Sequence, residues 1–192
     1  MKKRAAVLAA CGLVPAFAAQ LAGAQDADRT LSVFAGQMTS NHFEELFRPG
    51  DVDFVDSQLL GIALAQDWPL GDSRWTWGIE LQLLRHFGLQ DHWEANLPLI
   101  LRYHPERPFS RLLESVAFGV GASFASDVPE VEIRNDGDSR HSLVYWLLEA
   151  EFTAPRAGDS LFLRLHHRSD AFGALQPEAG SNAVVVGYRW SF

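Results

Sequence analysis

The sequence contains a single cysteine, Cys11, and only two lysines, Lys2 and Lys3, and all three lie in its first 24 residues. The rest of the chain therefore has no disulfide, thiolate metal site or thiol nucleophile. From residue 27 onward no stretch approaches the roughly 20 apolar residues that a membrane-spanning helix needs, which excludes a helical membrane protein. Strands of a membrane barrel need only about 10 residues of alternating polarity each, so a barrel is compatible with this hydropathy.

The first 24 residues have the layout of a secretory signal peptide. Residues 2–4 are basic, an Ala-, Leu- and Val-rich segment follows, and residues 22–24 match an Ala-x-Ala cleavage site. We therefore predict a signal peptide at 1–24 and a single exported domain at 25–192. Cleavage before Cys11, as in a lipoprotein, would leave an apolar segment of only a few residues, which disfavours that alternative.

Charge limits the partners of the mature chain. The formal net charge of −8 falls to −11 when the signal is removed, because that segment carries three basic residues and no acid. Arginine is then the only strong base that remains. A strongly acidic domain without lysine is not typical of a protein that binds nucleic acid, and we expect no nucleic-acid partner.

Eight segments combine β-branched and aromatic residues with period-two alternation and are bounded by turn residues, as expected of strands. An even number of strands of this length is the pattern of a transmembrane barrel. We therefore predict an all-β fold, an eight-stranded antiparallel transmembrane β-barrel. The predicted strands span 30–38, 58–68, 75–86, 93–104, 115–126, 143–153, 161–169 and 182–192.

The two faces of these strands differ in chemistry. In 75–86, Trp77 and Ile79 alternate with Glu80 and Gln82. A water-soluble barrel or sandwich would bury the apolar face and expose the charged one. A narrow membrane barrel reverses this arrangement, because side chains fill its interior and acids can pair there with arginines. The charged residues on the predicted inward face are Glu80, Glu94, Glu149, Glu151, Arg102, Arg164, Arg168 and Arg189.

Aromatic residues favour the membrane alternative. Trp and Tyr lie near strand ends, as the interfacial girdle of a membrane barrel requires. The chain also ends on Tyr188, Trp190 and Phe192, alternating to a C-terminal aromatic, which resembles the assembly signal of outer-membrane barrels. We therefore expect the protein in the outer membrane of a Gram-negative bacterium. The girdle residues are Trp68, Trp75, Trp77, Trp93, Tyr103, Tyr188 and Trp190.

An even strand number places both termini at the periplasmic side, so alternate connections lie outside the cell. The predicted outer connections are 39–57, 87–92, 127–142 and 170–181, and within them only 41–47 has helical character. The third of these connections is rich in acids. Its carboxylates are either solvated or in contact, through divalent cations, with phosphorylated lipid, because clustered carboxylates suit hard cations.

A cluster that could carry chemistry lies at the outer end of the seventh predicted strand. By alternation His167 and Ser169 face lipid, and counting back from Phe192 places Asn182 on the outward face of the neighbouring strand. An imidazole and a hydroxyl in lipid are costly unless they lie near the interface and have partners. A serine hydroxyl, a histidine that takes its proton and a polar residue that orients the ring are the parts of a hydrolytic nucleophile.

In this region the chain resembles the outer-membrane lipid A deacylases and the related acyloxyacyl-hydrolase-like barrels. The similarity lies in 162–192: a His-x-Ser motif, a loop containing glycine, and a polar residue that opens the last strand. The resemblance implies a serine esterase that removes a 3-O-linked hydroxyacyl chain from lipid A, with Ser169 as nucleophile and His167 as general base. It implies lipid A of lipopolysaccharide as the substrate, and no cofactor or metal at the nucleophile.

Two positions depart from the family pattern. The deacylases have asparagine directly after His-x-Ser and a glutamate near the start of the last strand, where this chain has Asp170 and Asn182. Asn182 is the first choice for orienting His167 because alternation puts it on the right face, but it would not stabilise an imidazolium as a carboxylate does. Glu178, in the connecting loop, is the second choice, and Asp170 is a further candidate.

Backbone N–H groups of 170–173, in particular those of Asp170 and Gly173, are candidates for an oxyanion hole, because a glycine permits a tight turn that exposes donors. His166 and Arg168 point inward by alternation, and we expect them to pair with interior acids.

Other functions are compatible with the sequence. The main alternative is a non-catalytic structural or adhesin-like barrel, in which His167 and Ser169 are interfacial residues. A lipid A acyltransferase is a further alternative. A conducting pore is disfavoured because eight strands leave an interior only wide enough for side chains. The sequence leaves open whether the protein forms a homodimer.

Overall fold

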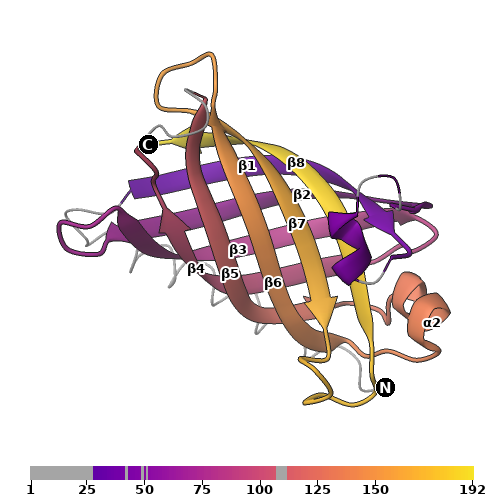
Figure 1. The fold of residues 1–192 in the computed structure, drawn as a ribbon. Coiled ribbons are helices and arrows are strands. Elements are labelled where there is room, and N and C mark those ends of the chain that lie inside the picture. The colour runs from indigo at the N-terminus through magenta and orange to yellow at the C-terminus, as the bar shows by residue number, and fades with distance from the viewer. Residues whose placement is uncertain (1–27, 42, 49, 51, 107–111) are drawn as a thin grey trace, which may run out of the picture.

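The computed structural model describes residues 28–192 apart from 42, 49, 51 and 107–111, so the predicted signal peptide at 1–24 lies outside the described residues. Eight strands, each paired with the next, close into an antiparallel barrel in which β1 also pairs with β8 (Figure 1). The predicted fold class is confirmed. The strands are β1 (Asp28–Thr39), β2 (Phe54–Pro69), β3 (Trp75–Gly88), β4 (Trp93–Tyr103), β5 (Leu113–Ala125), β6 (Ser142–Thr153), β7 (Ser160–Ser169) and β8 (Gly180–Ser191).

Two short helices lie in the connections at one end of the barrel. The 3-10 helix η2 (Phe43–Phe47) follows β1, in the segment with predicted helical character, and α2 (Glu130–Asp136) follows β5. Both lie at the end opposite the C-terminus (Figure 1). Neither of these helices, nor any other in the described part of the chain, is long and apolar enough to cross a membrane.

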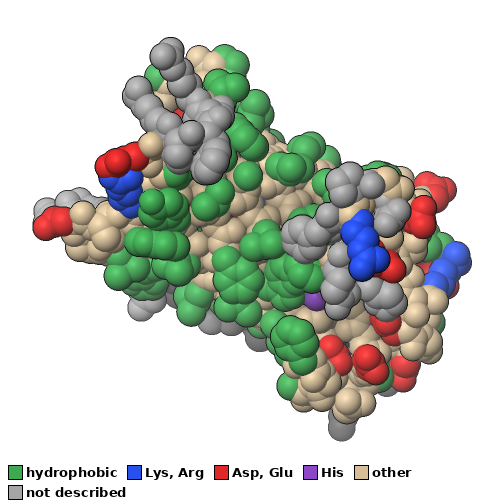
Figure 2. Space-filling model, viewed as in Figure 1, with side chains coloured by type: hydrophobic (Ala, Val, Ile, Leu, Met, Phe, Trp, Pro, Cys, Tyr) green, Lys and Arg blue, Asp and Glu red, His purple; other side chains and the backbone are tan. Residues whose placement is uncertain are grey.

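The outer surface of the barrel is apolar between its two ends. Hydrophobic side chains cover this band, and charged side chains gather at the ends (Figure 2). At the end near the C-terminus, the Trp68 and Trp77 rings stack with centroids 4.6 Å apart, and those of Trp75 and Tyr103 lie 4.8 Å apart. An apolar band with an aromatic rim is the surface that lipid requires. Exposed members of the band include Leu60, Ile62, Leu99, Phe118, Leu163 and Val186.

Ion pairs fill the middle of the barrel interior. The Glu149 carboxylate accepts hydrogen bonds from Arg102 at 2.9 Å, from Arg164 at 2.6 Å and from Arg189 at 2.9 Å. Arg164 also donates to Glu80 at 2.8 Å. All five side chains are buried. The predicted pairing of inward acids with inward arginines is confirmed, and it leaves the interior filled by side chains.

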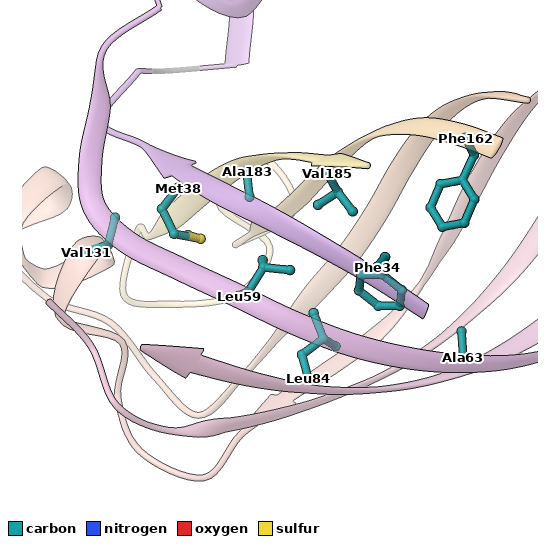
Figure 3. Close-up of a cluster of buried hydrophobic side chains, with 9 residues drawn as sticks. All are labelled: Phe34, Met38, Leu59, Ala63, Leu84, Val131, Phe162, Ala183 and Val185. Atoms are coloured by element: carbon teal, nitrogen blue, oxygen red, sulfur yellow. The ribbon is translucent and has the colours of Figure 1, made fainter. Parts of the chain in front are cut away.

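A cluster of buried apolar side chains lies inside the barrel beside this network (Figure 3). It is formed mainly by inward residues of β1, β2 and β8. Val131 of α2 belongs to it, so the helix closes this end of the barrel by adding to its core. The members of the cluster are Phe34, Met38, Leu59, Ala63, Leu84, Val131, Phe162, Ala183 and Val185.

The acidic connection between β5 and β6 is not simply solvated. Glu132 of α2 is fully buried, accepts a hydrogen bond from Ser181 Oγ at 2.8 Å and another from Ser139, and lies 3.3 Å from Arg168 Nη1. Burial raises the pKa of the Glu132 carboxyl, and the Arg168 guanidinium opposes that shift. The expectation of a solvated or cation-binding carboxylate was therefore wrong for Glu132, which anchors α2 to the barrel.

Candidate active site

His167 and Asn182 are direct partners on the neighbouring antiparallel strands β7 and β8. Their side chains meet, with 2.6 Å between His167 Nδ1 and Asn182 Oδ1. Because an amide oxygen can only accept a hydrogen bond, Nδ1 carries the proton, and the lone pair of the neutral ring is on Nε2. The strand register therefore holds the imidazole in the tautomer that a general base needs.

Asn41 fixes the direction of the Asn182 amide. Asn182 Nδ2 donates to the Asn41 carbonyl oxygen at 2.8 Å, so Oδ1 is the amide atom that faces His167. Asn41 follows β1, where Thr39 is the Cα partner of Asn182. The Asp53 N–H in turn donates to Asn41 Oδ1 at 2.7 Å and joins the two ends of this connection. A chain of hydrogen bonds from the β1–β2 connection thus orients the imidazole.

Aromatic rings cover His167 from outside the barrel. Trp146, its Cα partner on β6, has its ring centroid 4.4 Å from the imidazole, and Phe43 of η2 lies at 5.6 Å. The Phe43 and Trp146 rings meet edge to face at 4.3 Å. His167 is therefore only 9% exposed. The expectation that it contacts lipid was wrong, because Phe43 of η2 and Trp146 lie against the ring. In Figure 1, η2 lies over the outer side of the barrel.

Ser169 ends β7, two positions beyond His167, and its side chain is half-buried. Positions two residues apart in a strand are separated by about 7 Å, and their side chains leave the same face. Rotation of the Ser169 side chain therefore changes the distance between its hydroxyl and the His167 ring. The Ser169 Oγ accepts a hydrogen bond from the Ala171 N–H at 3.4 Å. Ser169 thus lies further along the same outward face as His167, at the end of the strand.

An unusual turn follows Ser169. Ala171 and Phe172 both have φ of 58°, and Gly173 has φ of 82°. This left-handed region is easy for glycine but strained for alanine and more so for a bulky phenylalanine. The Phe172 side chain is fully exposed. Strain of this kind is concentrated at functional sites, where the surrounding structure maintains it for a purpose.

The N–H groups predicted for an oxyanion hole differ in their availability. Asp170 N–H donates to the Ala179 carbonyl oxygen at 2.9 Å, and Gly173 N–H donates to Asp170 Oδ2 at 2.9 Å. Phe172 N–H, in the same turn, has no acceptor among the described residues. Within the predicted range, the Phe172 N–H is therefore available without rearrangement. The N–H groups of Asp170 and Gly173 would each have to break an existing hydrogen bond to bind an oxyanion.

Of the three residues proposed to orient the ring, Asn182 is the one that the fold brings to it. The Asp170 carboxylate accepts from the Gly173 N–H instead, and Glu178 is exposed in the β7–β8 connection. A carboxylate partner for the imidazole is therefore not supplied by either loop residue in this conformation.

The two inward residues of the motif have structural partners, as predicted. His166 Nε2 lies 3.0 Å from the Glu94 carboxylate, and Arg168 pairs with Glu132. They belong to the interior of the barrel, whereas His167 and Ser169 belong to its outer side.

Sequence reasoning missed three contributors to the site, namely Asn41, Phe43 and Trp146. The position of Asn41 could have been predicted from barrel closure, because the end of β1 must lie beside the start of β8. Trp146 could have been found in the same way, as the outward residue of β6 opposite His167. The position of Phe43 depends on the path of a connection, which alternation does not describe.

Comparison with known proteins concerns the fold. No protein-family model matches the chain, and no curated protein matches its sequence. Among solved structures, the outer membrane enzyme PagL is 17% identical with a TM-score of 0.59, covering 84% of this chain and 98% of its own. Neisserial surface protein A is 8% identical with a TM-score of 0.50, covering 88% of this chain and 100% of its own. The chain therefore has the closed eight-stranded fold of outer-membrane barrels such as PagL.

Proposed function

We propose that this protein is an esterase of the Gram-negative outer membrane that removes an ester-linked 3-hydroxyacyl chain from lipid A. The observation that carries the proposal is the 2.6 Å contact between His167 Nδ1 and Asn182 Oδ1, which leaves Nε2 as a base, with Ser169 two residues along the same face. The similar fold of PagL, an outer membrane enzyme, supports catalysis on this scaffold.

The reaction follows from the roles of these groups. His167 Nε2 takes the Ser169 Oγ proton as Oγ attacks the ester carbonyl carbon of lipid A. The tetrahedral intermediate expels the sugar hydroxyl, which receives the proton from His167. Water, deprotonated by His167, then attacks the acyl-serine carbonyl and releases the hydroxy fatty acid, which regenerates Ser169. The Phe172 N–H is the first candidate for stabilising the oxyanion, with Asp170 and Gly173 as further donors.

The position of the site suits a substrate that stays in a membrane leaflet. Ser169 is the last residue of β7, on the same strand face as the exposed Leu161 and Leu163, and β7 ends at the end of the barrel opposite the C-terminus (Figure 1). With the termini in the periplasm, this end meets the outer leaflet, where lipopolysaccharide resides. Phe172, three residues after Ser169, has an exposed side chain that can contact acyl chains there.

A non-catalytic surface barrel is the second candidate. Asn182 favours it, because an amide orients the ring but does not stabilise the imidazolium that forms during catalysis. Neisserial surface protein A has a similar fold.

Lipid A mass spectra distinguish the two candidates. Wild type and Ser169→Ala would be expressed in an outer membrane that contains hexa-acylated lipid A, and heat-modifiable gel mobility would confirm that both fold. We expect loss of one hydroxyacyl mass with the wild type and intact lipid A with Ser169→Ala. Intact lipid A with both folded proteins contradicts the esterase, and a gain of acyl mass indicates an acyltransferase.

The role of Asn182 as a positioning residue predicts an order of rates. Asn182→Ala is expected to lower the rate of fatty acid release about 100-fold, because the ring loses its tautomer and orientation. Asn182→Asp keeps an acceptor for Nδ1–H and adds a charge that stabilises the imidazolium, but it loses the hydrogen bond to the Asn41 carbonyl oxygen, so we expect it to be more active than Asn182→Ala. Measuring release from purified lipid A tests this order. Equal rates for Asn182→Ala and the wild type contradict the role.

A further inference from the structure

A second group of polar side chains lies inside the barrel, separate from the candidate active site. His86 on β3, Glu94 on β4 and His92 in the short connection between these strands are all buried. Each offers one ligand atom, and these atoms lie within 4.8 Å of one another. The three residues come from a single hairpin, so its geometry alone sets their spacing.

His92 is the feature that needs an explanation. Its side chain is 2% exposed, and its Nε2 has no hydrogen-bond partner among the described residues. A buried ring nitrogen without a partner is destabilising, and such an atom in a folded protein indicates a bound water or ion. The His92 ring stacks on the His86 ring at a centroid distance of 4.4 Å, so the orphaned nitrogen belongs to a ring that packs directly against a second candidate ligand.

The other two ligands are held by neighbours. His86 Nε2 lies 2.9 Å from Glu94 Oε2, and Gln90 Nε2 lies 2.9 Å from His86 Nδ1. On the opposite side of the carboxylate, His166 Nε2 of β7 lies 3.0 Å from Glu94 Oε1. A histidine beside a ligating carboxylate and a polar group that bonds to the second nitrogen of a ligating histidine are the kinds of support that metal sites use.

We propose that His86, His92 and Glu94 bind a divalent transition metal of the zinc type. Two imidazoles and one carboxylate, with a fourth position for water, form a ligand set that zinc adopts. Calcium and magnesium require mainly oxygen ligands, and one carboxylate does not supply them. Imidazole nitrogen suits Zn²⁺, Ni²⁺ and Cu²⁺, and zinc is the ion chosen for the test.

Binding exchanges interactions that already exist. The ion replaces the proton between His86 Nε2 and Glu94, and the ring takes up a proton at Nδ1, so His86 changes tautomer and no net proton is released. Rotation of the Gln90 amide then lets its oxygen accept from His86 Nδ1–H, at the expense of its 3.3 Å bond from the Val131 N–H. The ion thereby joins the β3–β4 connection to the inner wall of the barrel. It does not touch His167 or Ser169, which lie on the outer side.

Zinc binding by the mature chain tests the proposal. Wild type, His92→Gln and His104→Gln would be produced without a polyhistidine tag, stripped with a chelator and folded in detergent. His104 is exposed at the other end of the barrel, so His104→Gln is the matched control. We expect equimolar zinc on the wild type and the control by elemental analysis after gel filtration. In calorimetric titrations, His92→Gln is expected to bind zinc at least about 10-fold more weakly.

Cobalt provides a measurement that does not depend on the folding of a variant. Co²⁺ on the folded wild type is expected to give the intense visible bands of a tetrahedral nitrogen and oxygen site, and zinc is expected to remove them. Any of three results overturns the proposal. They are a wild type that does not retain equimolar zinc, a wild type that does not give this cobalt spectrum, and a zinc affinity of the wild type equal to that of folded His92→Gln.

Discussion

Mature protein carrying His167→Ala or Ser169→Ala is expected to release hydroxy fatty acid from lipid A about 10⁴-fold more slowly than the wild type. The double variant is expected to be no slower than either single variant. A nucleophile and its base act as one unit, because Ser169 without a proton acceptor is as ineffective as an acceptor without a nucleophile. If His167 served only to pack beneath Phe43 and Trp146, its replacement would leave the rate close to that of the wild type.

The rates would be measured with purified lipid A in mixed micelles, by quantifying the fatty acid released. His141→Ala is the matched control, because His141 is exposed at the same end of the barrel, just before β6. We expect it to retain the wild-type rate. Losses that add up in the double variant would show that the two residues act in separate steps, against the proposed mechanism.

The strands could be predicted because lipid and a filled interior impose opposite chemistry on alternate residues. The prediction is least accurate where this contrast ends. β2 begins at Phe54, four residues before the predicted start at residue 58. Beyond the apolar band the outer face meets water, so Asp56 can point outward and the apolar alternation disappears. α2 was missed for a related reason, since a helix of one or two turns has too few residues to show a period.

The pairing of His167 with Asn182 could be predicted because it depends on strand register. Counting from Phe192 placed Asn182 on the outward face, and antiparallel pairing brought the two residues opposite each other. The shielding of the ring depends instead on a contact between segments 141 residues apart, in which Asn182 Nδ2 donates to the Asn41 carbonyl oxygen. That contact fixes the path of the β1–β2 connection and brings Phe43 over His167. A pattern along one strand contains no information about it.

Glu149→Ala is expected to lower the free energy of unfolding by about 3–5 kcal/mol, the largest stability effect that the structure predicts. Glu149 accepts hydrogen bonds from Arg102, Arg164 and Arg189. Its removal takes one carboxylate partner away from each of these three buried guanidinium groups. Removing one partner of a buried ion pair is costly because the remaining charge stays desolvated. Adding Arg164→Met to Glu149→Ala restores the charge balance, so the double variant is expected to be more stable than Glu149→Ala alone.

Urea unfolding in lipid vesicles, followed by tryptophan fluorescence, measures these differences. Glu114→Ala is the control, since Glu114 is exposed near the start of β5 and its replacement is expected to change stability by less than about 0.5 kcal/mol. A similarly small change for Glu149→Ala would mean that water reaches the interior and solvates the arginines. The interior would then not be the tightly filled, charge-balanced core that the ion pairs of Glu149 indicate.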